Sequence, residues 1–500
     1  MVKVDFEEFR KDNIGMILDF MKKCIRSVDT EHPVIADNIF SMTTLDFAHT
    51  RAQDDWTVAE KADIFGIDIY PKFMEKPAPG FFRWQTYASA HSAARSGRFW
   101  VSELQSHHSF MFAAPTYVYP QELRLWCWEA ISHGAKGLMF WKWEPFNKGS
   151  QTFGRGLVDM KGNYTSRALE AESVGRIIAE NEKEFADYMP ESPKVAILFD
   201  RLSDDFVRTL VKSARTSTSL KDSFYLHSIM GLYRCLWEQN IAAKFIMDRD
   251  IVENRADSYK AIFVSNHVNM SLELSAGLSR YVEQGGVIIA DGKFGEIGND
   301  GLVYESIPGE GLAEFAGFEI LDMRPDKLGL ELPEAIFGEA LKIDGFYERR
   351  ELQIVDGNTA VWASYSDGLP AIVQTKRGKG DLIYLSTFFW FGYMNTNQGD
   401  IKKFMSFLDK RYSLRTNEIN DDDLKICALC GDDGQILFVF NYAETDKEAS
   451  ALLNIGSDGE YLVTNLYSKE SGAVCAENGK LDLDVSVKAG DVTIYMVKRV

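Results

Sequence analysis

The sequence has 500 residues, 45% of them hydrophobic and 13% aromatic, and this length predicts two to four domains with separate cores. The formal net charge of −19 argues against nucleic acid or an anionic membrane as a partner, because both require positive charge. No stretch approaches the roughly 18 consecutive apolar residues of a membrane-spanning helix, so none is predicted.

The N-terminus and the cysteines favour a cytoplasmic protein. The first ten residues are charged and contain no apolar segment, so no secretory signal is predicted. The six cysteines are scattered and are interpreted as reduced thiols. Cys427 and Cys430 form a C-x-x-C, but they lie in an alternating strand pattern that points residues three apart to opposite faces. His107 and His108 are adjacent and cannot easily converge on one ion. We therefore predict no metal site.

Four apolar strands alternate with helical patterns in the first part of the chain. A helical pattern over residues 5–30 precedes the strands, which are predicted at 34–38, 64–71, 99–103 and 137–143. This is the rhythm of a barrel or of a doubly wound sheet. Four units cannot close an eight-stranded barrel, which takes roughly 250 residues. The pattern predicts half of a (β/α)8 barrel in a truncated chain, with an open four-stranded sheet as the alternative.

The rest of the chain predicts two further domains. A charged connecting helix over 166–193 follows the half barrel of residues 1–165. Residues 194–412 alternate strands and helices again, as in a flavodoxin-like or amidotransferase-like sheet, with an irregular, Gly-rich insertion at 293–365. Residues 420–500 contain short strands between Gly, Asn and Asp turns, which predict a small all-β sandwich. The overall fold class is therefore α/β with a terminal β domain.

Two features of the 194–412 segment bear on its role. An active amidotransferase or hydrolase needs a nucleophile elbow of the form G-x-[CS]-x-G, which the segment lacks, and Cys235 lies in the middle of a predicted helix. The residues from Arg377 to Gly380 lack the spacing of a phosphate-binding loop and predict a hairpin turn. We therefore expect this domain to be structural.

The third strand ends on Glu103. Catalytic residues of a barrel lie at the C-terminal ends of its strands, so Glu103 is the candidate nucleophile of a glycosidase, or else a capping or salt-bridging carboxylate. Trp141 and Trp143 share one strand face by alternation. Their ring faces would meet the C–H face of a sugar, or would pack against the outer helices.

Four motifs occur in an order that is recognisable. They are Gly66–Pro71, which contains D-x-Y-P; Ser102–Gln105, which contains E-x-Q; His133–Gly137 leading to Trp143-Glu144-Pro145; and Gly156–Asp159. In these motifs and in its three-domain layout, the chain resembles glycoside hydrolase family 42, the clan-A β-galactosidases, over essentially its whole length. The 194–412 segment is similar to the trimerisation domain of that family.

The resemblance implies a retaining β-galactosidase that needs no cofactor. Glu103 would be the nucleophile, and Tyr70 would donate a hydrogen bond to it. Where the family carries a Glu that holds sugar hydroxyls, this chain has Gln151, and where it commonly carries a Trp over the sugar, this chain has Met111. Asn38 ends the fifth strand of the complete barrel and either binds sugar or caps the next turn. The predicted substrate-binding residues are Tyr70, Trp143, Trp141, Gln151 and Asn38.

The resemblance also implies that strands one to four are missing, together with the general acid/base on an Asn-Glu pair. A retaining glycosidase needs two carboxyl groups about 5–5.5 Å apart. The Asn-Glu pairs here, Asn181-Glu182 and Asn417-Glu418, lie outside the barrel segment. Expected partners are a β-galactoside, further copies in a homotrimer, and a separate N-terminal half-barrel chain. The alternatives are a non-catalytic oligomerisation or sugar-binding remnant, and a β-glycosidase for another sugar. Because an open half barrel exposes apolar edges, we expect poor solubility.

Overall fold

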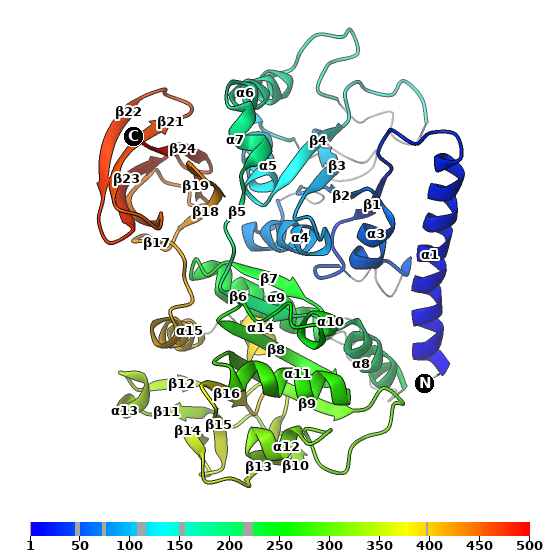
Figure 1. Ribbon diagram of the computed structural model, residues 1–500, viewed down its shortest axis with the longest axis vertical. Coiled ribbons are helices and arrows are strands. Elements are labelled where there is room, and N and C mark those ends of the chain that lie inside the picture. The colour runs from blue at the N-terminus through cyan, green and yellow to red at the C-terminus, as the bar shows by residue number, and fades with distance from the viewer. Residues whose placement is uncertain are drawn as a thin grey trace. The chain divides into compact units, whose positions relative to one another are not determined.

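The computed structural model (Figure 1) describes residues 2–45, 51–72, 77–107, 117–149, 156–213, 224–396 and 399–500. The chain divides into two compact units. The barrel unit comprises Asp12–Met42, Gln53–Ser192 and Thr416–Val500, and the middle unit comprises Met1–Lys11, Thr43–Ala52 and Pro193–Arg415. Among the described residues, no helix is long and apolar enough to cross a membrane.

The barrel unit contains a four-stranded parallel sheet in the order β1-β2-β3-β4, as predicted. Helices alternate with these strands and follow α1 (Val2–Arg26). Neither β1 nor β4 pairs with a further strand in the described part of the chain, so the sheet has two open edges. The elements are β1 (Ile35–Ile39), α3 (Asp55–Lys61), β2 (Ile64–Ile69), α4 (Gly80–Ala93), β3 (Phe99–Gln105), α5 (Pro120–Ser132) and β4 (Ala135–Trp141).

The two faces of this sheet differ in character. Ile67 and Val101 are fully buried on the face that the helices cover, whereas Asp37 on the opposite, inner face is exposed. A Cβ atom on Gly137 would lie 2.4 Å from the Trp100 ring, so a glycine is required where this indole crosses the inner face. The helices therefore bury one face, and the inner face carries both the exposed Asp37 and the Trp100 indole.

The predicted single connecting helix is wrong. The segment forms α6 (Ser166–Glu180) and α7 (Glu182–Asp187), separated at Asn181, whose φ of −130° ends the first helix. Its end forms β5 (Met189–Pro190), which pairs with β18 of the C-terminal sandwich. An Asn at a helix end favours this break, because its side chain competes for backbone hydrogen bonds.

The C-terminal residues form the predicted sandwich of two antiparallel sheets, with strand orders β17-β20-β23 and β22-β21-β24-β19-β18-β5. Buried residues from both sheets, such as Leu437 and Leu481, form its core. The strands are β17 (Glu418–Ile419), β18 (Leu424–Gly431), β19 (Gly434–Asn441), β20 (Lys447–Asn454), β21 (Gly459–Asn465), β22 (Ser471–Ala476), β23 (Lys480–Val487) and β24 (Val492–Arg499).

A buried polar network joins this sandwich to the barrel helices within the same unit. Arg83 donates to both oxygens of Glu129, at 2.7 Å each. Tyr442 Oη donates to Glu129 Oε1 at 2.6 Å and accepts from Trp84 Nε1 at 2.6 Å. Glu129 is completely buried, so each member of the network depends on the others for its hydrogen bonds.

The middle unit contains a nine-stranded sheet in the order β12-β11-β14-β15-β16-β9-β8-β6-β7. Five of its strands are parallel, and their spatial order β7-β6-β8-β9-β16 is the 2-1-3-4-5 order of a flavodoxin-like fold, as predicted. These strands are β6 (Val195–Leu198), β7 (Ala243–Ile246), β8 (Ala261–Asn269), β9 (Val287–Ile297) and β16 (Gly380–Leu385). The helices of this part are α8 (Arg201–Ser213), α9 (Phe224–Glu238), α10 (Asp248–Val252), α11 (Leu272–Glu283), α14 (Phe389–Thr396) and α15 (Gly399–Tyr412).

The expectation that residues 293–365 are irregular is wrong. They contain short strands that extend the sheet through antiparallel pairs or form the separate pair β10-β13. Strands of three to seven residues with half-exposed faces carry a weak periodicity, which explains the error. The predicted hairpin is present at Arg377–Gly380, between β15 and β16. The elements are α12 (Leu312–Ala316), β10 (Phe318–Arg324), β11 (Leu330–Leu332), α13 (Glu334–Phe337), β12 (Leu341–Ile343), β13 (Arg349–Ile354), β14 (Thr359–Tyr365) and β15 (Pro370–Arg377).

Candidate active site

Glu103 lies near the carboxyl end of β3, level with Asp68 on β2 and with Ile39 on β1. A register shift between Ile67 and Asp68 interrupts the pairing of β2 with β3 at this point. Such bulges re-aim side chains, and they recur beside active sites. Glu103 is partly exposed, so its carboxylate is accessible from the open side of the sheet.

Tyr70 follows directly after β2 and holds Glu103. Its hydroxyl donates a hydrogen bond to Glu103 Oε2. Burial, together with the neighbouring Glu103 carboxylate, holds the pKa of Tyr70 well above its usual range, so the phenol keeps its proton. The two residues therefore meet as the sequence predicts, with Tyr70 as the donor and Glu103 as the acceptor.

Asp68 is a site residue that sequence reasoning did not single out. Burial, and then the charges of Asp37 and Glu103, raise its pKa to about 8. At neutral pH Asp68 is therefore mostly protonated and adds no second negative charge beside Glu103. Its position in D-x-Y-P, two residues before Tyr70 on the same strand face, was the available signal.

Gln105, the last residue of the E-x-Q motif, fixes the segments after β2 and β3. Its Oε1 accepts from the backbone N–H of Lys72 at 2.7 Å. Its Nε2 donates to the carbonyl of Lys72 at 3.1 Å and to that of His107 at 2.9 Å. Because Lys72 lies two residues after Tyr70, this fully buried amide helps to hold the Tyr70 segment beside the Glu103 strand.

The two tryptophans do not share a strand face, because β4 ends at Trp141 and the alternation stops there. Trp141 packs edge-on against Phe146, with ring centroids 6.1 Å apart. Trp143 is 54% exposed and packs edge-on against Tyr164. Of the two, Trp143 offers the larger accessible aromatic surface.

Asn38 faces the helices rather than the inner face of the sheet. It is level with the buried Ile67, and its Nδ2 donates to Asp55 Oδ1 of α3 at 2.9 Å. Asp55 is completely buried, and burial raises its pKa to about 6. Hydrogen bonds from Gln53, Ser41, Met42 and Asn38 act in the opposite direction and lower this pKa. Asn38 thus connects β1 to α3, which corrects the expectation that it faces the sugar.

Three residues named from the sequence lie outside the described residues: Gln151, Met111 and His108. His107 is described and almost fully buried, and its Nδ1 donates to the carbonyl of Trp141 at 2.8 Å. It therefore connects the end of β3 to the end of β4.

Neither Asn-Glu pair lies at the carboxyl end of a barrel strand. Glu182 opens α7, and Glu418 lies in the short strand β17 of the sandwich. The Asn417 amide donates to Glu191 at 2.7 Å. Neither pair therefore supplies a second carboxylate at the strand end that carries Glu103.

This arrangement agrees with the comparison with protein families. The family model described as beta-galactosidase matches residues 1–181, and the model described as beta-galactosidase trimerisation domain matches residues 193–415. The chain belongs to glycoside hydrolase family 42. The family predicted from the motifs is therefore confirmed.

Curated relatives carry the same description. The chain is 25% identical to the beta-galactosidase LacZ of Heyndrickxia coagulans over 394 residues, which cover 77% of this chain and 55% of that protein. It is 21% identical to the beta-galactosidase BgaA of Clostridium cellulovorans over 481 residues, which cover 93% of this chain and 68% of that protein. The chain spans about half the length of the first curated relatives that it matches.

Solved structures show the same fold. The beta-galactosidase from Bacillus circulans sp. alkalophilus superposes with a TM-score of 0.79 at 17% identity, covering 99% of this chain and 68% of that chain. The beta-galactosidase from Rahnella sp. R3 gives a TM-score of 0.78 at 18% identity, covering 100% of this chain and 68% of that chain. These likenesses confirm the predicted fold class of half barrel, amidotransferase-like α/β domain and small all-β sandwich.

Proposed function

We propose that this chain is the nucleophile-bearing part of a retaining β-galactosidase. The observation that carries the proposal is the hydrogen bond from Tyr70 to Glu103 at the carboxyl ends of neighbouring parallel strands. Family membership and the curated relatives support the choice of a terminal β-linked galactose as substrate.

The site residues then divide the chemistry as follows. Glu103 attacks the anomeric carbon through an oxocarbenium-like transition state, the aglycone oxygen leaves, and a covalent glycosyl-enzyme forms. Water later displaces Glu103 with net retention. Tyr70 holds one carboxylate oxygen, which orients the other for attack and stabilises the carboxylate when it leaves. A protonated Asp68 keeps the surroundings of Glu103 from accumulating charge.

The sugar-binding residues extend from this centre. We assign Trp143 as the stacking surface, because it is the more exposed of the two tryptophans. Trp141 and Gln151 complete the proposed set. Gln151 retains hydrogen-bonding capacity but lacks the charge-assisted strength of a Glu, so we expect weaker selection for galactose hydroxyls.

The general acid/base comes, in this proposal, from polypeptide outside these 500 residues, either on the same chain or on a separate one. Two observations support it. Within the described residues, the edge strands β1 and β4 of the parallel sheet pair with no further strand. Helix α1 exposes a row of large apolar residues that a soluble surface does not need. Those that are more than half exposed are Val2, Phe6, Phe9, Met16, Phe20 and Met21.

The 194–412 domain would assemble the protein into a trimer, as the description of its family model suggests. A cytoplasmic location and a role in carbohydrate metabolism complete the proposal. The six cysteines are all unpaired, which fits a reducing compartment.

Hydrolysis assays test this function directly. We expect the chain, supplied with a polypeptide that contains the first four barrel strands, to hydrolyse an aryl β-galactoside, and Glu103→Gln to abolish the reaction. Glu172→Gln, an exposed substitution on α6, is the control. Full activity of Glu103→Gln would refute the assignment of the nucleophile. A panel of aryl glycosides with different sugars separates a galactosidase from a related β-glycosidase.

A second candidate is a non-catalytic protein that oligomerises or binds sugar. The single assigned carboxylate in the described residues favours it, because retention needs two. Sugar binding without turnover, unchanged when the missing half barrel is added, would support this candidate.

A further inference from the structure

Three side chains of the middle unit converge at the carboxyl ends of neighbouring parallel strands, remote in sequence from the glycosidase residues. Asp200 follows β6, Asp248 follows β7, and His267 lies near the end of β8. In the 2-1-3-4-5 strand order, β6 and β8 flank the point where the connections change direction, which is where ligands bind in open α/β sheets.

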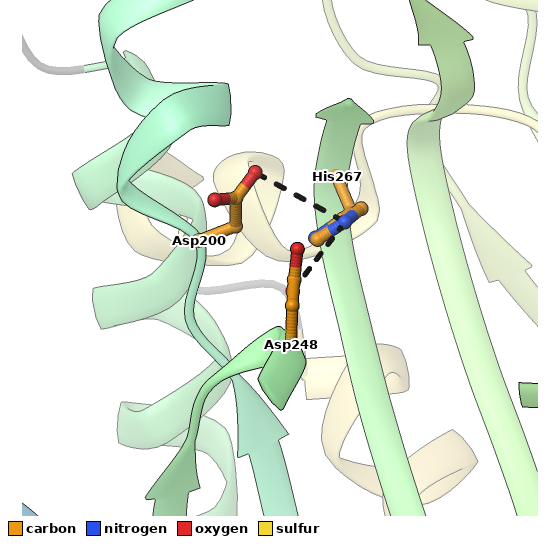
Figure 2. Close-up of side chains that lie close together, drawn as sticks. All are labelled: Asp200, Asp248 and His267. Carbon is orange, nitrogen blue, oxygen red and sulfur yellow. Dashed lines mark ion pairs between the residues drawn. The ribbon is translucent and has the colours of Figure 1, made fainter. Parts of the chain in front are cut away.

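The imidazole of His267 is directed between the two carboxylates (Figure 2). Its Nε2 lies 3.8 Å from Asp248 Oδ1 and 4.0 Å from Asp200 Oδ2. One ligand atom from each residue lies within 4.8 Å of the others. Ligands bound at about 2.0–2.2 Å can be up to about 4.2 Å apart, so a small rotation of the partly exposed Asp248 closes the set around one ion.

Two of the polar atoms directed into this cluster have no hydrogen-bond partner among the described residues. His267 is fully buried, and within the described part of the chain neither its Nε2 nor Asp248 Oδ1 has a hydrogen-bond partner. A buried polar atom left without a partner costs about 1–3 kcal/mol, so an occupant that satisfies these atoms would stabilise the fold.

The charges at the cluster favour a cation. In the described ion pairs, no Lys or Arg pairs with Asp200 or Asp248. A divalent cation would neutralise both carboxylates.

The backbone around the cluster holds it in place. The Asp200 carboxylate caps α8 by accepting from the N–H groups of Leu202 at 2.9 Å and Ser203 at 2.8 Å. Ser203 Oγ in turn accepts from the N–H groups of Val268 and Asn269, at 2.9 and 3.0 Å. These bonds connect the end of β6 to the residues directly after His267.

We propose that Asp200, Asp248 and His267 bind a divalent transition-metal cation of the Zn²⁺ or Mn²⁺ type. One imidazole nitrogen and two carboxylate oxygens suit these ions, whereas Mg²⁺ and Ca²⁺ prefer oxygen ligands alone. Three protein ligands leave a coordination position for water or a small ligand. The ion would connect the ends of β6, β7 and β8.

Calorimetric titration of the full chain, first stripped of metal by dialysis against a chelator, tests this site. We expect wild type to bind one equivalent of Zn²⁺, and Mn²⁺ more weakly, with Mg²⁺ the weakest. Asp248→Asn and His267→Gln should each weaken Zn²⁺ binding at least tenfold. Zn²⁺ should also raise the melting temperature of wild type but not of Asp248→Asn. Because Asp248 is partly exposed, its substitution leaves the core intact.

Two controls exclude other Zn²⁺ ligands. The double substitution Cys427→Ser/Cys430→Ser should leave binding unchanged, because burial raises the pKa of both thiols to about 12 and disfavours thiolates. Glu253→Gln removes an exposed carboxylate just after α10 and should also have no effect. The proposal is overturned if wild type binds no Zn²⁺, or if Asp248→Asn and His267→Gln bind it as tightly as wild type.

Discussion

Tyr70 Oη donates a hydrogen bond to Glu103 Oε2, and the two residues come from the ends of neighbouring parallel strands. This pairing depends on the parallel register of β2 and β3, which brings together residues that are 33 positions apart. The contact gives Glu103 a fixed orientation. In the proposed mechanism, it also supplies a donor that stabilises the carboxylate when the bound sugar is released.

Replacing Tyr70 by Phe tests this second role. Hydrogen bonds to charged groups contribute about 1.5–3 kcal/mol, so we expect Tyr70→Phe to slow release of the sugar from Glu103 about tenfold or more. Pre-steady-state kinetics of the reconstituted enzyme on an activated aryl β-galactoside measure that step. Tyr461→Phe, which removes a hydrogen-bonded phenol in the sandwich, is the matched control. Equal rates for both variants would contradict the role of Tyr70.

Replacing Asp68 by Asn tests the protonation of the site. The folded-state pKa of Asp68, about 8, lies above its ordinary value of 3.8, so wild type loses stability as pH rises between these values. Asn has no proton to lose. We expect the free energy of unfolding of Asp68→Asn, relative to that of wild type, to increase between pH 4 and pH 8. At pH 8 this difference should be about 1–3 kcal/mol, after allowance for solvent screening. Urea unfolding at both pH values measures this, and a pH-independent difference would contradict it.

Much of the fold could be predicted because the strands that mark it are strongly apolar. The four barrel strands and the five parallel strands of the middle unit contain clear runs of apolar residues, such as that of β2. The spacing of these runs indicates helices between them. The contact between Tyr70 and Glu103 could be predicted because both residues lie at strand ends in recognisable motifs.

The remainder depends on tertiary contacts that have no local pattern. Asn38 binds Asp55, whose burial follows from the packing of α3 on the sheet. Trp143 lies beyond the end of β4, so alternation could not place it. Asp200, Asp248 and His267 have no motif spacing, and only the parallel order of their three strands brings them together.

The network around Glu129 should determine the stability of the barrel unit. Breaking a buried ion pair by removing one partner costs about 3–5 kcal/mol, because the other charge remains buried. We expect Glu129→Gln to leave Arg83 uncompensated and to lower the free energy of unfolding of this unit by that amount. Chemical denaturation followed by tryptophan fluorescence measures it, with Glu172→Gln as the exposed control. A loss below about 1 kcal/mol would contradict the prediction.

Helix α1 should determine how the isolated chain behaves in solution. Phe20 is 67% exposed and Met16 is 58% exposed, so we expect the chain alone to associate through this surface and to be poorly soluble. The double substitution Met16→Glu/Phe20→Glu should raise solubility several-fold while leaving the circular dichroism spectrum unchanged. Light scattering during concentration measures the effect. A monodisperse, freely soluble wild type would contradict the prediction.

The most direct test of the central claim is covalent labelling of Glu103 by 2,4-dinitrophenyl 2-deoxy-2-fluoro-β-galactoside. Dinitrophenolate leaves without protonation, so the reaction requires the nucleophile but not the general acid. Intact-mass and peptide mass spectrometry should show one fluorogalactosyl group on Glu103 of wild type and none on Glu103→Gln. Labelling of a different carboxylate, or none even when the first four barrel strands are supplied, would contradict the account.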